Sequence, residues 1–228
     1  MSRTALAFAL SFALASASAF GHDHDHDHPG QSIDKVNGSI TAEANQSYGD
    51  LETVNGSIRL ESSARAGDTE TVNGSINAAD NVSVASLSTV NGSIRVGTQA
   101  RIARDVETVN GSIFIDNGGD VGGGIETVNG AIGLVDTDLA GGIETVNGDI
   151  TVGIGSHVKG GIRIEKPHGW SFQKRKPPRI IIGPNAQVDG AMVFERPVVL
   201  YVHSTAKVGR ITGATAIAYS SARAPTEE

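Results

Sequence analysis

Thr53-Val54-Asn55-Gly56-Ser57-Ile58 is one copy of a phrase that recurs seven times in this chain of 228 residues. Val-Asn-Gly is followed by Ser-Ile in five copies, by Ala131-Ile132 in the sixth and by Asp149-Ile150 in the seventh. Successive copies are 18 or 19 residues apart, and their valines are Val36, Val54, Val72, Val90, Val109, Val128 and Val146. A period near 18 residues is too short for helix-pair repeats or propeller blades, and it fits one coil of a β-solenoid.

The Asn-Gly pair is also a strong signal for a β-hairpin turn. In a two-residue hairpin the motif Val and Ile would point to opposite faces, because side chains alternate along a strand. Both positions are apolar in every copy, so each hairpin would have to be buried on both sides. We therefore favour stacked coils over a meander of hairpins.

The fourth repeat indicates how one coil is divided. Its apolar or small residues are Val90, Ile94, Val96, Ala100, Ile102, Val106 and Val109. Pairs two residues apart, repeated about every six, predict three short strands and three bends per coil. The expected fold is all-β: a single-stranded, three-sided β-solenoid (β-helix) with about 18 residues per coil. We place Asn-Gly at a corner, where Gly, and Asn with it, can take a positive φ.

Equivalent residues on successive coils should stack about 4.8 Å apart. The motif asparagines then form an amide ladder of structural role, as in cross-β assemblies: Asn37, Asn55, Asn73, Asn91, Asn110, Asn129 and Asn147. The apolar alternation continues less regularly beyond the last copy. We predict one solenoid over residues 31–218 with a loop insertion at 165–179, and a disordered tail at 219–228.

Residues 1–19 have the layout of a secretory signal peptide: a charged start, a short apolar run and small residues up to Ala19. We expect an exported protein (periplasmic, outer-membrane-associated or secreted) with no transmembrane segment after cleavage. The chain has no Cys, so its stability must come from the core and the ladders rather than from disulfides. A net charge of −7 argues against nucleic acid as a partner.

Thr53–Ile58 and its six sisters resemble the repeats of a bacterial adhesin-like family of unknown biochemical function, whose members carry repeated Val-x-Asn-Gly-x-Ile phrases. The repeat style is also similar to that of bactofilins, which are polymer-forming β-helical proteins. The resemblance covers about residues 33–165. It implies an extended surface or envelope protein and a right-handed solenoid, and it supplies no functional residues.

Residues 20–30 form a leader, expected to be disordered, in which histidine and aspartate alternate: His22, Asp23, His24, Asp25, His26, Asp27 and His28. Imidazoles interleaved with carboxylates could chelate Zn²⁺, Cu²⁺ or Ni²⁺. Cleavage after Ala19 would also let the new terminal amine, two amides and His22 surround Cu²⁺ or Ni²⁺ in a square plane. The alternative is a solvated leader, and nothing else in the chain requires a cofactor.

The interruption at 165–179 carries five cations and the only Trp of the chain. It could contact an anionic polymer or lipid head groups through Lys166, Trp170, Phe172, Lys174, Arg175, Lys176 and Arg179. Alternatively, Trp170 covers an apolar gap between coils while the cations remain solvated.

A glutamate stands two residues before the motif Val in five copies: Glu52, Glu70, Glu107, Glu126 and Glu144. A divalent cation could relieve the repulsion within such a stack, although solvated carboxylates need no ligand. No nucleophile stands out beside a base, so we expect no enzymatic activity.

These features predict a non-enzymatic, exported β-solenoid that serves as a structural or adhesive scaffold of the bacterial cell envelope. Its partner would be an envelope polymer or a surface ligand, and its exposed coil edges would permit end-to-end self-association. One alternative is a periplasmic divalent-metal-binding protein that uses the His/Asp arm. Another is a polysaccharide-active β-helix enzyme.

Overall fold

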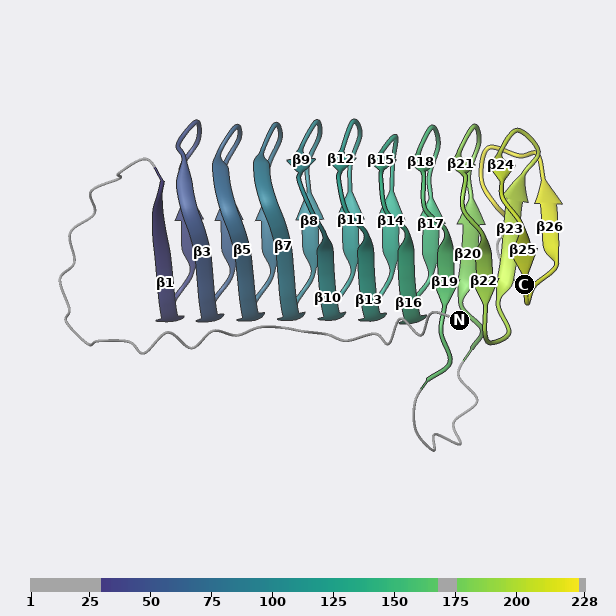
Figure 1. Ribbon diagram of the computed structural model, residues 1–228, viewed down its shortest axis with the longest axis horizontal. Helices are drawn as coiled ribbons and strands as arrows, with labels where there is room; N and C mark the ends of the chain where they lie inside the picture. Colours follow the sequence, from purple (N-terminus) through teal and green to yellow (C-terminus); the bar gives the residue numbers. More distant parts are fainter. Residues whose placement is uncertain (1–29, 168–175, 226–228) are drawn as a thin grey trace.

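The computed structural model describes residues 30–167 and 176–225. They form an all-β solenoid of about ten coils, stacked side by side into a rod (Figure 1). Partner strands run parallel, and most pairs join residues 18 or 19 apart, as in Asn55↔Asn73 and Asn91↔Asn110. The predicted fold class is therefore confirmed, and the hairpin alternative is excluded.

The strands follow one another coil by coil, from β1 in the first coil to β26 in the last. The first four coils contain β1 (Gln31–Asn37), β2 (Ile40–Ala42), β3 (Tyr48–Asn55), β4 (Ile58–Leu60), β5 (Arg65–Asn73), β6 (Ile76–Ala78), β7 (Ser83–Asn91) and β8 (Ile94–Val96). The next three contain β9 (Arg101–Ile102), β10 (Val106–Asn110), β11 (Ile113–Ile115), β12 (Asp120–Val121), β13 (Ile125–Asn129), β14 (Ile132–Leu134), β15 (Asp138–Leu139), β16 (Ile143–Asn147) and β17 (Ile150–Val152). The last three contain β18 (His157–Val158), β19 (Ile162–Ile164), β20 (Arg179–Ile182), β21 (Gln187–Val188), β22 (Met192–Phe194), β23 (Val199–His203), β24 (Lys207–Val208), β25 (Ile211–Thr212) and β26 (Ala216–Tyr219).

Three strands per coil, as predicted, begin only with β9. In the earlier coils two of the sides merge into one long strand, such as β7. Val84 and Leu87 are three residues apart in β7, whereas their partners Ile102 and Val106 are four apart. The extra residue breaks the strand into β9 and β10, at the point where the repeat first lengthens to 19 residues.

The interior is one continuous apolar cluster from Ile40 to Leu200. The motif Ile is buried there, but six of the seven motif valines are not: Val36 is 62% exposed and Val90 is half-buried, whereas Val146 is 6% exposed. Thr89, one residue earlier, is buried instead, and its hydroxyl donates to the Gly74 carbonyl of the preceding coil at 2.9 Å. Hydropathy alone would place Val90 in the core, but the inward side of this strand alternates through Leu87 and Thr89.

Asn-Gly does lie at a bend, but its expected positive φ is wrong for most copies. Only Gly38 and Gly130 among the seven motif glycines have positive φ, and no motif Asn does. The left-handed residues recur at another bend of the coil, at Asn45, Ser63, Asn81, Gln99, Gly118, Asp136, Gly155 and Asn185. The motif Gly is needed for a different reason: a Cβ on Gly56 would collide with the Gly38 carbonyl of the coil below.

Two predicted boundaries need correction. Arg179, assigned to the loop, begins β20, because Ile180 and Ile182 on either side of Ile181 return to the core. Tyr219, assigned to the disordered tail, is the last residue of β26; it is 8% exposed and its hydroxyl donates to the Ile182 carbonyl at 3.2 Å. Among the described residues, no helix is long and apolar enough to cross a membrane.

One buried position breaks the pattern. Thr69 takes the inward position that Leu51 and Leu87 occupy on neighbouring coils. It is 0% exposed, and its hydroxyl has no hydrogen-bond partner among the described residues.

Thr69→Val should therefore stabilise the rod by about 1–2 kcal/mol, since it removes an unsatisfied buried hydroxyl while keeping the shape. Thr71→Val is the matched control: Thr71 donates to the Gly56 carbonyl at 2.8 Å, so its loss should lower stability. Urea melts of both variants measure the difference, and equal effects would contradict the assignment of an unsatisfied hydroxyl.

Candidate functional site

The asparagine ladder runs unbroken through seven coils. Each Asn side-chain amide donates to the amide oxygen of the preceding Asn, over six bonds of 3.0–3.1 Å from Asn37 to Asn147. The prediction of this ladder is confirmed. All six bonds point the same way, so the amide dipoles add and the ladder ends in an acceptor oxygen at Asn147.

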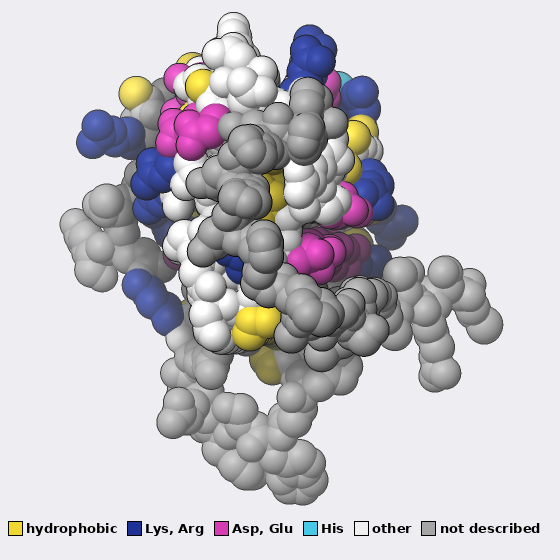
Figure 2. Space-filling view, turned by 90° about the vertical axis from the view of Figure 1, so that its left-hand side faces the viewer, with side chains coloured by type: hydrophobic (Ala, Val, Ile, Leu, Met, Phe, Trp, Pro, Cys, Tyr) yellow, Lys and Arg dark blue, Asp and Glu magenta, His cyan; other side chains and the backbone are white. Residues whose placement is uncertain are grey.

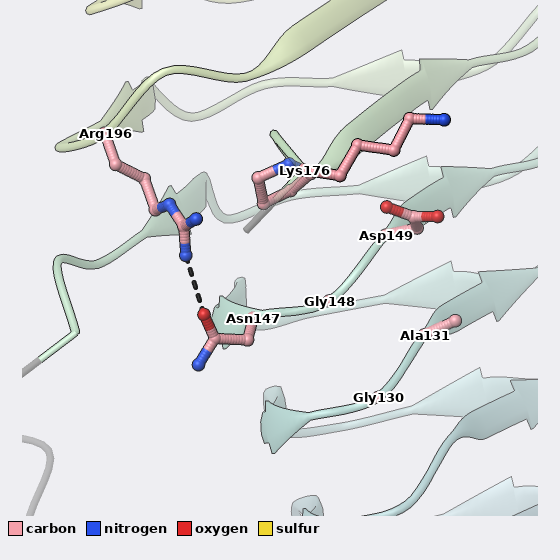
Figure 3. Close-up of a pocket in the computed structure, with 8 residues that line it drawn as sticks. Gly130, Ala131, Asn147, Gly148, Asp149, Lys176 and Arg196 are labelled. Atoms are coloured by element: carbon pink, nitrogen blue, oxygen red, sulfur yellow. Dashed lines mark hydrogen bonds between the residues drawn. The ribbon is translucent and has the colours of Figure 1, made fainter. Parts of the chain in front are cut away.

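Arg196 closes this acceptor end. Its guanidinium donates to the Asn147 side-chain oxygen at 2.7 Å (Figure 3). It also donates to the Val146 carbonyl at 3.0 Å. Strand register places Thr145, Ile164 and Phe194 in one row. Asn147 lies two residues after Thr145, and Arg196 lies two residues after Phe194. Arg196 therefore occupies the position of the ladder asparagine, two coils beyond Asn147. The coil between them cannot extend the ladder, because the chain leaves the rod after β19.

A cavity of about 320 Å³ opens beside this cap. Its lining is formed by Gly130, Ala131, Asn147, Gly148, Asp149, Lys176, Pro178 and Arg196. The Asp149 carboxylate is engaged, since it accepts from the Arg179 backbone N–H at 2.8 Å. Figure 3 shows Arg196 and Lys176 on the later coils and Asp149 on the coil below them. The chemistry of this lining suits a small polar group better than an apolar one.

The structure divides the predicted basic loop. Lys176 joins Arg196 at the cavity, while Lys166 is exposed where the chain leaves the rod. Arg179 turns elsewhere: its guanidinium lies 5.1 Å from the centre of the Tyr201 ring and donates to the Pro225 carbonyl. The remaining predicted residues, Trp170, Phe172, Lys174 and Arg175, lie outside the described residues. Sequence reasoning missed Arg196, although counting the register beyond Asn147 could have found it.

The predicted metal-binding arm, His22–His28, also lies outside the described residues. Across residues 30–167 and 176–225, no group of three or more His, Asp or Glu side chains is arranged to hold a metal ion. The arm's chelation of Zn²⁺, Cu²⁺ or Ni²⁺ therefore remains a prediction from sequence.

The glutamates do form one row on the outside of the rod. Register aligns Glu52 with Glu70, and Glu107 with Glu126 and Glu144; Ser88 separates the two groups. Viewed end-on from β1, acidic side chains stand one behind another along one face (Figure 2). The row ends at Arg163, whose Nε lies 3.8 Å from a Glu144 carboxylate oxygen.

Stacking perturbs these carboxyls. Burial raises the pKa of Glu126 to about 7, with the charges of Glu107 and Glu144 adding to the effect. Burial likewise raises the pKa of Glu52, Glu70, Glu107 and Glu144. A raised pKa is typical of catalytic acids, but here the same half-buried group recurs along a regular row, and burial together with the neighbouring charges accounts for the raised pKa.

Removing the Arg196 cap should destabilise the rod. Arg196→Met leaves the Asn147 oxygen and the Val146 carbonyl without their charged donor, which should cost about 1–3 kcal/mol. Arg210→Met is the control, because it removes the same positive charge from an exposed position. It should change the free energy of unfolding little. Denaturant unfolding measures both; an unchanged midpoint for Arg196→Met would show that the cap contributes nothing.

The glutamate row should make stability fall as pH rises. The folded-state pKa of Glu126, about 7, exceeds its unfolded value of about 4.3. The folded chain thus binds more protons between these values, and its stability declines from about pH 4.5 to about pH 7. Glu126→Gln should raise the melting temperature at pH 8 and leave it nearly unchanged at pH 4. Glu43→Gln, at an exposed position, makes the same change of charge and should produce no such pH-dependent gain.

Comparison with known proteins found no family model that matches this chain, and no curated protein or solved structure with detectable similarity to it. The adhesin-like and bactofilin-like resemblance of the repeats therefore stays a prediction from the motif.

Proposed function

We propose that this chain is a non-enzymatic, exported scaffold of a bacterial cell envelope, which attaches to an envelope polymer along the side of its rod. One observation carries the proposal, which is the regularity of the rod. The apolar core, the threonine hydroxyl bonds and the asparagine ladder recur from coil to coil, and Arg196 caps the end of the ladder. Such regularity supports a rigid, extended body whose outer rows present side chains at constant spacing.

Regularity also weighs against catalysis. Active sites gather unlike groups in strained, local settings. In this rod the non-glycine residues of positive φ recur at one bend of successive coils, and the glutamates recur in one row. An array of equivalent positions is better suited to multivalent attachment than to turnover.

The two ends of the rod differ in a way that bears on self-association. In β1, Lys35 takes the inward position that Thr53 holds in the next coil, and an inward charge at a strand edge discourages pairing. In the last coil, Ala216 and Ala218 align with inward positions but are exposed. End-to-end association would therefore use the C-terminal coil.

Fractionation of cells that express the tagged full chain tests the proposal. We expect a product shortened near Ala19, located outside the cytoplasm, whose purified form cosediments with isolated envelope fragments. A variant that lacks residues 1–19 should stay in the cytoplasm. An unprocessed cytoplasmic product, or a processed one that does not cosediment, would refute the scaffold.

Deleting residues 22–28 separates this proposal from the metal-binding alternative. If the scaffold is right, cosedimentation persists while Zn²⁺ binding, followed by calorimetry, falls. Loss of cosedimentation together with Zn²⁺ binding would move the function to the His/Asp arm.

A further inference from the structure

The outer face of the 10-stranded sheet carries a row of unlike side chains. Register aligns Arg59 of β4, Asn77 of β6, Arg95 of β8 and Phe114 of β11 along the rod, followed by Gly133 of β14. A groove of about 280 Å³ lies along this row. Glu61 and Asp116 also line it, so the lining offers both hydrogen-bond donors and acceptors.

Two members of the row are unusually available. Arg95 is exposed, and its guanidinium makes no hydrogen bond or ion pair with any residue in the described ranges. Phe114 is 36% exposed and is the one aromatic among the exposed large hydrophobic side chains of the described chain. Its ring leans toward Gly133, where a Cβ would come within 3.2 Å of the ring. A side chain at position 133 would therefore crowd the ring.

The surroundings limit what could bind. The four strands are internal to their sheet, so their backbone groups are paired and an added peptide strand would find no free edge. The carboxylates of Glu61 and Asp116 disfavour a nucleic-acid backbone. Guanidinium, carboxamide and carboxylate groups beside one aromatic face instead match hydroxyl-rich rings, which both donate and accept hydrogen bonds and have an apolar face.

We propose that this groove is a binding site for a linear glycan that lies parallel to the rod. The row advances by about 4.8 Å per coil, close to the rise of one sugar along an extended glycan. Successive sugars would then meet Arg59, Asn77, Arg95 and Phe114 in turn, with one ring stacked on Phe114 and hydroxyl or carboxylate oxygens accepting from Arg95. This inference rests on the proposed function, because it names the class of polymer to which the scaffold attaches.

Calorimetric titration of the purified chain with two linear probes, a chitin hexasaccharide and a hyaluronan hexasaccharide, tests the site. We expect at least one probe to bind, and Arg95→Ala and Phe114→Ala each to weaken it by about tenfold, as for the loss of one good contact. Arg101→Ala, which removes an exposed arginine from β9 in another sheet, should leave affinity unchanged. Thermal melts of all three variants check that they fold.

The outcomes separate this inference from the proposed function. Binding that survives both Arg95→Ala and Phe114→Ala, or a single N-acetylglucosamine that binds as tightly as the hexasaccharides, would overturn the groove. So would binding of neither probe. If the chain still cosediments with envelope fragments in any of these cases, the scaffold stands and only its glycan groove fails.

Discussion

The hydrogen bonding between coils is the constraint on which the rest of the molecule depends. It holds each residue about 4.8 Å from its counterparts above and below, so any side chain must tolerate a near-copy of itself at that distance. The motif glycines show how strict this is. At Gly74 and Gly92 a Cβ would collide with the glycine carbonyl of the preceding coil, and this is why the repeat keeps Gly although these residues have no positive φ.

The same spacing sorts polar side chains by chemistry. An amide both donates and accepts, so Asn55 can satisfy Asn37 below and Asn73 above at 3.0–3.1 Å. A carboxylate can only accept, and a stack of carboxylates must shed charge or lose stability. The same spacing between coils thus strengthens the asparagine row and half-buries Glu126 among other carboxylates, which raises its pKa to about 7. Ser88 and Arg163 fall in the glutamate row and interrupt or end its run of like charges.

The repeat allowed the solenoid, its coil length and the asparagine ladder to be predicted, because these depend on what recurs. Orientation within a strand was harder. Val90 looked like a core residue on hydropathy alone, yet Thr89 points inward, since its hydroxyl can reach the Gly74 carbonyl. Period-two patterns are ambiguous by one residue when both neighbours are β-branched. The role of Arg196 is not visible in the repeat motif itself, because Phe194 pairs with Ile164, 30 residues earlier rather than 18 or 19. Only a register counted across this longer coil would have identified it.

In a stacked repeat, a functional site is best sought where equivalent residues differ from coil to coil although packing does not require the difference. Inward positions are held to apolar residues and Thr by packing and by the hydroxyl bonds. Outward positions on the 10-stranded sheet face no such demand, yet along one row they change from Arg to Asn to Arg to Phe over consecutive coils. The stacking of coils does not require a guanidinium without a partner, such as that of Arg95. Nor does it require an exposed aromatic ring such as that of Phe114, because leaving apolar surface in water does not stabilise the fold. A ligand that spans several coils would give both a role, and the coil spacing makes a linear polymer its natural form.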